Sequence, residues 1–206
     1  MTFRALNTEF DEVVIIDLLP ESERIRWRIT EDLEKDLTSL RFPQYTISCA
    51  SKKDVFDAFE WCVKHVKEKN FILQFTAHGN QSGIGLKATS EFIAWKELRP
   101  GLTQLNSAMS GNLILNMVAC KGIYGTDIQL LEDPADPFFG IVGPLHNIEV
   151  AQAKRVSTAF YKEMVTATEI PSIVAGINKA EGSNVLWCIS SQMRRQRSGQ
   201  ELAFKA

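Results

Sequence analysis

Two apolar segments of the chain each end close to a residue that can take part in nucleophilic chemistry. The run 71–76 (FILQFT) is followed closely by His78, and the run 113–118 (LILNMV) is followed closely by Cys120. A cysteine thiolate attacks a carbonyl carbon, and an imidazole moves the proton between the thiol and the leaving amine. Together the two side chains would support acyl transfer, which includes the hydrolysis of peptide bonds.

A glycine stands close behind each of these residues. Gly79 lets the backbone approach a substrate, so that its amide N–H can point at a developing oxyanion. The N–H of Cys120 is a natural second donor, and Gly122 lets the chain turn away after the cysteine. Each residue alone is compatible with packing or with a turn. Their conjunction at two strand ends favours a functional site.

Such a site needs a sheet that brings the two strand ends together. Short apolar runs, rich in β-branched residues, alternate with longer stretches of helical spacing. We expect strands at residues 13–19, 45–49, 71–76, 113–118, 138–142 and 185–189. The pattern predicts an α/β fold, a three-layer sandwich with a mostly parallel central sheet of about six strands and helices on both faces. Ligands of such sheets bind beyond the carboxyl ends of the strands. His78 and Cys120 would therefore meet there if their strands are neighbours, about 4.8 Å apart.

Helices are expected between the strands. One should open at Pro20 and present a single apolar stripe, and another should follow Ser51; the stripe comprises Ile25, Ile29, Leu33 and Leu37. Further helical patterns cover residues 92–109, 149–168 and 171–180. Pro100 should bend or interrupt the first of these. The segment 122–137 is expected to be an irregular loop, of a length that is often functional.

Length and charge narrow the classes of function. The 206 residues fit one domain, which we place at residues 1–191, followed by a basic tail at 192–206 that we expect to be flexible. Lys and Arg total 23 against 25 Asp and Glu, which argues against a nucleic-acid partner bound by bulk positive charge and against an anionic membrane.

The cysteine spacing and the length of the apolar runs indicate which cofactors and which cellular compartment to expect. The four cysteines form no CxxC pair, so we predict no zinc ribbon, no other metal site and no cofactor. No apolar run approaches the roughly 20 residues needed to span a bilayer, and the first residues lack the pattern of a signal peptide. We therefore expect a cytoplasmic protein with free thiols.

The segments FILQFTAHG and LILNMVACKG resemble the two hallmark blocks of caspase-like cysteine peptidases. In particular, VACKG resembles the caspase pentapeptide, which comes with a His about 50 residues upstream. EFIAWKEL between the blocks and FFGIVGPLHNIEVAQAKRVSTAFYKEM after them resemble CHAT domains, the prokaryotic branch of this clan. The resemblance covers about residues 70–170, and the earlier strands fit the same fold.

The resemblance implies roles for individual residues. His78 would be the catalytic histidine and Cys120 the nucleophile, with the main-chain N–H groups of Gly79 and Cys120 as the oxyanion hole. Caspases place a Gln two residues before the cysteine, where it helps to bind an acidic P1 side chain. Here Val118 stands at that position, so aspartate specificity is not implied.

Two further residues are candidates for substrate binding. Asp17 ends the first strand, a position from which related peptidases reach a basic P1 side chain, although a carboxylate bonded to a helix N-terminus is the alternative that we favour. His146 follows the fifth strand and could line the cleft or simply lie on the surface. The acidic residues of the loop could attract a basic substrate, but a solvated loop is the account that we favour; they are Glu132, Asp133 and Asp136.

Three classes of function remain to be compared. The first is a cysteine endopeptidase acting on protein or peptide substrates, latent until the loop 122–137 is cut or a protein partner binds, as in the bacterial defence (including antiviral) or cell-death systems that the resemblance implies. The second is a caspase-like scaffold without catalysis. The third, a nucleotide-binding domain, would need a glycine-rich turn after the first strand, where Leu18, Leu19, Pro20 and Glu21 stand instead.

Overall fold

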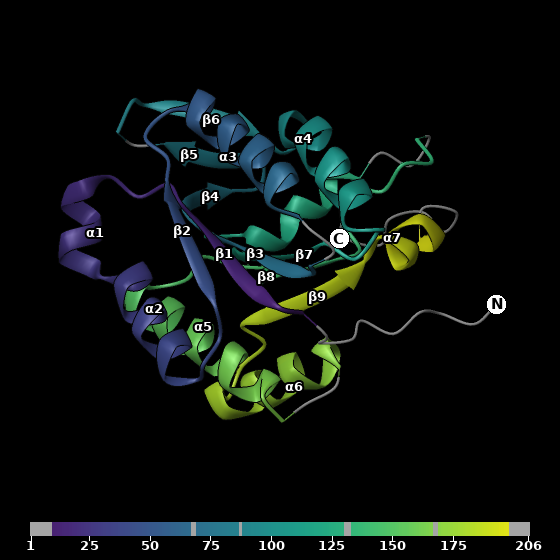
Figure 1. Ribbon diagram of the computed structural model, residues 1–206. Coiled ribbons are helices and arrows are strands. Elements are labelled where there is room, and N and C mark those ends of the chain that lie inside the picture. Colours follow the sequence, from purple (N-terminus) through teal and green to yellow (C-terminus); the bar gives the residue numbers. More distant parts are fainter. Residues whose placement is uncertain (1–9, 67–68, 87, 130–132, 167–168, 198–206) are drawn as a thin grey trace.

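A computed structural model describes residues 10–66, 69–86, 88–129, 133–166 and 169–197. Its centre is a six-stranded sheet with the strand order β2-β1-β3-β7-β8-β9 (Figure 1). The strands are β1 (Glu12–Asp17), β2 (Gln44–Ser48), β3 (Phe71–Thr76), β7 (Ile114–Val118), β8 (Gly140–Pro144) and β9 (Leu186–Ser190). All neighbouring pairs are parallel except β8 and β9. The predicted α/β fold with a mostly parallel sheet is confirmed.

Helices cover both faces of this sheet, so that two apolar cores lie on either side of it (Figure 1). Alternate residues of a strand point to opposite faces. Val14 and Ile16 of β1 accordingly belong to one core, and Val13 and Ile15 belong to the other. The first core is covered by α3 (Lys52–His65) and α4 (Trp95–Ala108), and the second by α2 (Ile29–Ser39), α5 (Val150–Met164) and α6 (Ile170–Glu181). Burial on both faces explains why these strands are continuous apolar runs.

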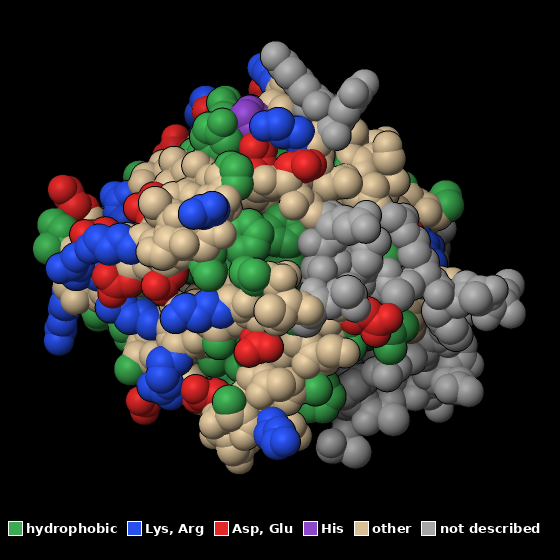
Figure 2. All heavy atoms as spheres, turned by 60° about the horizontal axis from the view of Figure 1, so that its bottom comes forward, with side chains coloured by type: hydrophobic (Ala, Val, Ile, Leu, Met, Phe, Trp, Pro, Cys, Tyr) green, Lys and Arg blue, Asp and Glu red, His purple; other side chains and the backbone are tan. Residues whose placement is uncertain are grey.

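The face that carries α2, α5 and α6 shows no segregation of charge. Figure 2 shows basic and acidic side chains interspersed towards its left and apolar side chains gathered near its centre. On α2 the mixture includes ion pairs of Glu31 with Arg28 and with Lys35. Within the described residues, no helix combines the length and the apolar character required to cross a membrane.

The helix expected after Pro20 is divided in two. Helix α1 (Glu21–Trp27) ends at Arg28, whose backbone is left-handed with φ 52°, and α2 starts directly after it. The predicted stripe holds for Ile29, Leu33 and Leu37, which are buried, but Ile25 is 70% exposed. The expectation of one continuous apolar face was therefore wrong, because the turn at Arg28 redirects α1 away from the core.

A small antiparallel sheet follows β3, and it comprises β4 (His78–Asn80), β5 (Gly83–Leu86) and β6 (Glu91–Ala94). Residues 92–94 were predicted to be helical, which was wrong, because they pair with β5 and bury Ile93. Helix α4 instead starts at Trp95 and continues through Pro100 to Ala108, so the proline does not end it.

Two segments expected to be irregular contain helices. The segment 122–137 opens with a 3-10 helix, η1 (Gly122–Ile128), and only its later part lacks helix and strand in the residues described. Helix α7 (Ser191–Arg197) extends into the expected flexible tail 192–206, and it packs against β9. Residues 198–206 of that tail and Glu132 of the loop lie outside the described residues.

Candidate active site

The two predicted segments meet at the carboxyl edge of the sheet. β3 and β7 are parallel neighbours in which Thr76 lies opposite Val118. The Ala77 N–H continues the pairing by donating to the Val118 carbonyl at 3.3 Å. His78 and Cys120 therefore follow adjacent strands that end at the same level. The sequence predicted this for the case that the two strands are neighbours, which they are.

Beyond this pairing, Gly79 touches the segment that carries Cys120. A β-carbon placed on Gly79 would lie 2.7 Å from the Cys120 carbonyl oxygen and 3.0 Å from the Ala119 β-carbon. Real β-carbons essentially never come closer than 3.0 Å to another heavy atom. The close approach of the two segments thus depends on the missing side chain at position 79.

The backbone around Cys120 is arranged as a tight turn. Lys121 adopts a left-handed conformation with φ 58°, and its N–H donates to the His146 carbonyl at 3.0 Å. The Gly122 N–H donates to the Ala119 carbonyl at 3.0 Å. Across the described part of the chain, the Cys120 N–H donates to no protein acceptor, so it can receive an oxyanion without breaking a bond.

The Cys120 thiol is partly exposed and lies 3.7 Å from the Ile148 carbonyl oxygen, to which it donates. The other three thiols are poor nucleophiles by comparison with an ordinary cysteine. Burial raises the pKa of Cys49 and of Cys62 to about 12, and that of Cys188 to about 11. Because the thiolate is the reactive form, these three should alkylate slowly near neutral pH.

The His78 imidazole is held by a carboxylate that the sequence did not predict. Its Nε2 atom lies 2.5 Å from Glu23 Oε2, and the side chains of His78 and Glu23 are 27% and 18% exposed. The Trp27 ring packs edge-on against the imidazole with 5.5 Å between centroids. Both contacts come from α1, whose redirection at Arg28 places this helix beside β4.

The bond to Glu23 bears on proton transfer. A carboxylate at Nε2 accepts the proton of that nitrogen, which leaves Nδ1 as the basic position of the neutral ring. This is the arrangement of a base oriented by a third group. No hydrogen bond joins His78 to Cys120 among the described residues; the imidazole is held by Glu23 and the thiol by the Ile148 carbonyl.

The residues proposed for substrate binding differ in accessibility. Asp17 is 1% exposed and its Oδ1 accepts the N–H of Leu19, which precedes α1, at 2.9 Å, so its carboxylate stabilises the turn into that helix. Burial raises the pKa of Asp17, and the hydrogen bond from the Leu19 N–H partly offsets that effect. A role of Asp17 in substrate binding stays a prediction.

Val118 and His146 contribute in different ways. Val118 is 5% exposed and packs in a small apolar cluster beneath the site with Leu19, Ile29 and Ala153. The side chain of His146 is exposed, whereas its carbonyl fixes the turn after Cys120. A role of either residue in substrate selection stays a prediction.

An open hollow of the surface lies away from His78 and Cys120. This hollow of about 660 Å³ lies between α6 and β9, lined among others by Val174, Asn178 and Trp187, and it includes neither His78 nor Cys120. Over the residues that the structure describes, no group of three or more potential metal ligands is present. Searches against protein-family models and against curated proteins found no match to the chain.

Proposed function

We propose that the chain is a caspase-like cysteine endopeptidase, with Cys120 as nucleophile and His78 as base and acid. The observation that carries the proposal is the contact of Gly79 with the turn that holds Cys120, at the ends of adjacent parallel strands. This contact brings together the two segments that carry the thiol and the imidazole, and among the described residues the Cys120 N–H donates to no acceptor. The resemblance of both segments to the CHAT branch of caspase-like peptidases adds to it.

The reaction would proceed through a thioester. The Cys120 thiol gives its proton to Nδ1 of His78 as the sulfur bonds to the scissile carbonyl carbon. The carbonyl oxygen becomes an oxyanion, which accepts hydrogen bonds from the N–H groups of Gly79 and Cys120. The imidazolium then protonates the leaving amine as the C–N bond breaks. Water, deprotonated by His78, attacks the thioester and releases the Cys120 thiol and the carboxylic acid product.

Glu23 has a positioning role in this scheme. Its carboxylate keeps the proton on Nε2 and stabilises the imidazolium that forms when Nδ1 accepts the thiol proton. The step also requires the imidazole and the thiol to approach each other when a substrate binds, since in the resting arrangement each is held elsewhere. Catalytic hydrogen bonds often form only in the substrate complex.

The test is turnover of a peptide library by four proteins. We expect cleavage by the wild type and by Cys188→Ala, which removes a thiol outside the site, and loss of cleavage in Cys120→Ala and His78→Ala. Equal cleavage by wild type and Cys120→Ala would exclude the proposal. Sequencing of the cleaved peptides would also identify the P1 preference.

The second candidate is a caspase-like scaffold without catalysis, and the missing bond between His78 and Cys120 favours it. The rate of alkylation by iodoacetamide separates the two. A peptidase requires Cys120 to react much faster than Cys49, Cys62 and Cys188, because its thiolate is the attacking form. Slow labelling at all four positions, together with no turnover, favours the scaffold.

Regulation by a partner forms part of the proposal. Because His78 and the thiol each have another partner in the resting arrangement, we expect the isolated chain to turn over substrate slowly, and the resemblance to CHAT peptidases connects such latency with bacterial defence or cell death. An activating protein partner would then have to bring His78 and Cys120 together. Full activity of the isolated, uncut chain would contradict this part alone.

A further inference from the structure

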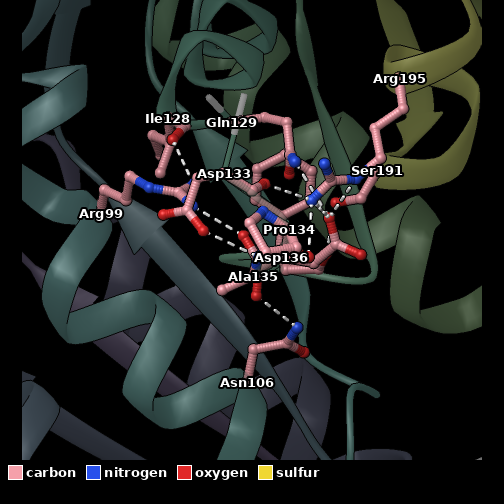
Figure 3. A network of polar contacts seen from close by, with 11 residues as sticks. Arg99, Asn106, Ile128, Gln129, Asp133, Pro134, Ala135, Asp136, Ser191 and Arg195 are labelled. Carbon is pink, nitrogen blue, oxygen red and sulfur yellow. Dashed lines mark hydrogen bonds and ion pairs between the residues drawn. The ribbon is translucent and has the colours of Figure 1, made fainter. Parts of the chain in front are cut away.

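A buried arginine of helix α4 binds the segment 122–136, which follows the proposed nucleophile. Arg99 is 6% exposed, and its guanidinium donates to the carbonyls of Ile128 at 3.1 Å and Ala135 at 2.7 Å. It also pairs with the Asp133 carboxylate at 2.5 Å (Figure 3). A guanidinium presents several donors in one fixed plane, so it can hold separate points of a chain at once.

Helix α7 binds the same segment, residues 122–136, through two further arginines. Arg195 binds the Asp136 carboxylate at 2.7 Å and the carbonyls of Asp133 and Pro134 at 2.8 and 2.9 Å (Figure 3). Arg194 pairs with Asp127 of η1 at 3.1 Å. α7 therefore contacts both η1 and the stretch 133–136, although all these partners lie far from it in sequence.

η1 in turn touches both halves of the proposed active site. It begins at Gly122, where a β-carbon would lie 2.4 Å from the Met117 carbonyl oxygen, so the turn after Cys120 is pressed against β7. On its other side, the Tyr124 hydroxyl accepts a hydrogen bond from Gln81 Nε2 at 3.2 Å. Gln81 is the first residue after β4, the strand that carries His78.

We propose that α7 is a strap that sets the positions of Cys120 and His78 through η1, so that release of the strap inactivates the site. Arg194 and Arg195 are positioning residues in this scheme, since they contact η1 and the stretch 133–136 and not the reacting atoms. The inference rests on the proposed peptidase function, and it adds a means by which that function is controlled. Any acidic partner segment that displaced Asp127 and Asp136 from the arginines would have the same effect as their removal.

The variant that tests the strap is Arg194→Gln/Arg195→Gln in the full chain. A positioning role predicts a fall in kcat by about tenfold or more with little change in KM, because misplacement of reacting groups by about 1 Å costs up to ~100-fold. Arg194→Lys/Arg195→Lys keeps the charges but not the planar fork, so it should recover part of the loss.

The matched control is Arg155→Gln, which removes an arginine pair with Glu181 between α5 and α6, on helices that do not carry the site. We expect it to keep the wild-type kcat. An unchanged kcat in the Arg194/Arg195 variant, or an equal fall in the Arg155 variant, would overturn the strap.

A readout independent of turnover separates this proposal from the peptidase function. Hydrogen exchange of the amides in residues 122–128 should accelerate at least tenfold in the Arg194→Gln/Arg195→Gln variant and stay unchanged in Arg155→Gln. If the wild type cleaves no peptide and Cys120 labels slowly, the peptidase proposal fails, whereas unchanged exchange in residues 122–128 rejects the strap whatever the activity.

Discussion

The substitution Gly79→Ala tests the contact on which the proposed function depends. Its β-carbon would lie 2.7 Å from the Cys120 carbonyl oxygen, whereas ordinary contacts begin at 3.4 Å, so the two segments must separate by about 0.7 Å. The second obstacle, the Ala119 β-carbon at 3.0 Å, is also fixed to the backbone and cannot rotate away. The separation therefore displaces the Gly79 amide relative to Cys120.

The expected effects follow from that displacement. A shift approaching 1 Å at a reacting centre costs up to ~100-fold in rate, so we expect kcat to fall by roughly 10- to 100-fold. Insertion of a methyl group into a filled site costs about 1–3 kcal/mol of unfolding free energy. The measurements are kcat and KM on the best peptide from the library and urea unfolding followed by circular dichroism.

Gly85→Ala provides the matched control within the same hairpin. Gly85 lies opposite His78, and the nearest atom to its added β-carbon is the His78 β-carbon at 3.9 Å, an ordinary contact. We expect wild-type kcat and equal or slightly higher stability, because glycine in a strand loses more backbone entropy on folding than alanine. A Gly79→Ala protein with wild-type kcat, or a Gly85→Ala protein that is equally impaired, would refute the reasoning.

Three further substitutions probe the site and its support. Glu23→Gln removes the counter-charge of the imidazolium at His78, so kcat should fall by about tenfold or more in the peptide assay while KM changes little. Burial raises the pKa of Asp17 in the folded state above its ordinary value near 3.8, so the folded state binds this proton more tightly than the unfolded state does. The resulting stabilisation is complete below pH 3.8 and is lost as the pH rises through the higher pKa of the folded state. Urea unfolding at several pH values should therefore show a smaller decline over this range in Asp17→Asn than in the wild type. Tyr161→Phe removes the hydroxyl that donates to Gln74 Oε1 at 2.9 Å inside the sheet core, and we expect a loss of about 1–3 kcal/mol in urea unfolding because a buried acceptor loses its donor.

The sheet could be predicted because several of its strands are short, continuous apolar runs, which are typical of strands buried on both faces. Residues 13–16 and 71–73 are continuous apolar runs, and the structure buries them on both faces. A strand between two helical layers requires such a run, whereas a strand with one solvated face alternates. The same signal placed the ends of β3 and β7, and with them His78 and Cys120.

The secondary structure was predicted wrongly where tertiary contacts outweigh the local preferences of the residues. Residues 92–94 carry no decisive strand signal, and they are extended because β5 offers them a partner. The break between α1 and α2 falls at Arg28, which adopts the left-handed conformation that glycine or asparagine usually takes at a helix end. A sequence pattern based on residue preferences has no means of finding such a break.

The unpredicted break also hid Glu23. In the predicted continuous helix, its position carried no information, because one polar residue on an exposed helix resembles any other. Only the turn at Arg28 directs α1 so that the Glu23 carboxylate reaches the His78 ring. The contacts of Arg194 and Arg195 were hidden for a related reason, since a basic C-terminal stretch gives no indication of the acidic groups that it will contact.

The order of the strands explains why Glu23, His78 and Cys120 lie at the same edge of the sheet. β1, β3 and β7 lie side by side in parallel, and their last residues form one row: Asp17 lies opposite Thr76, and Thr76 lies opposite Val118. The segments that follow these three strands carry the Glu23 carboxylate, the His78 imidazole and the Cys120 thiol, in that spatial order. Proton transfer to and from a nucleophile needs the base between its orienting group and the nucleophile. The central strand supplies that base, so exchange of the order of β1 and β3 would separate His78 from Cys120. This arrangement, more than any one residue, is the reason why we propose catalysis and not a purely structural role.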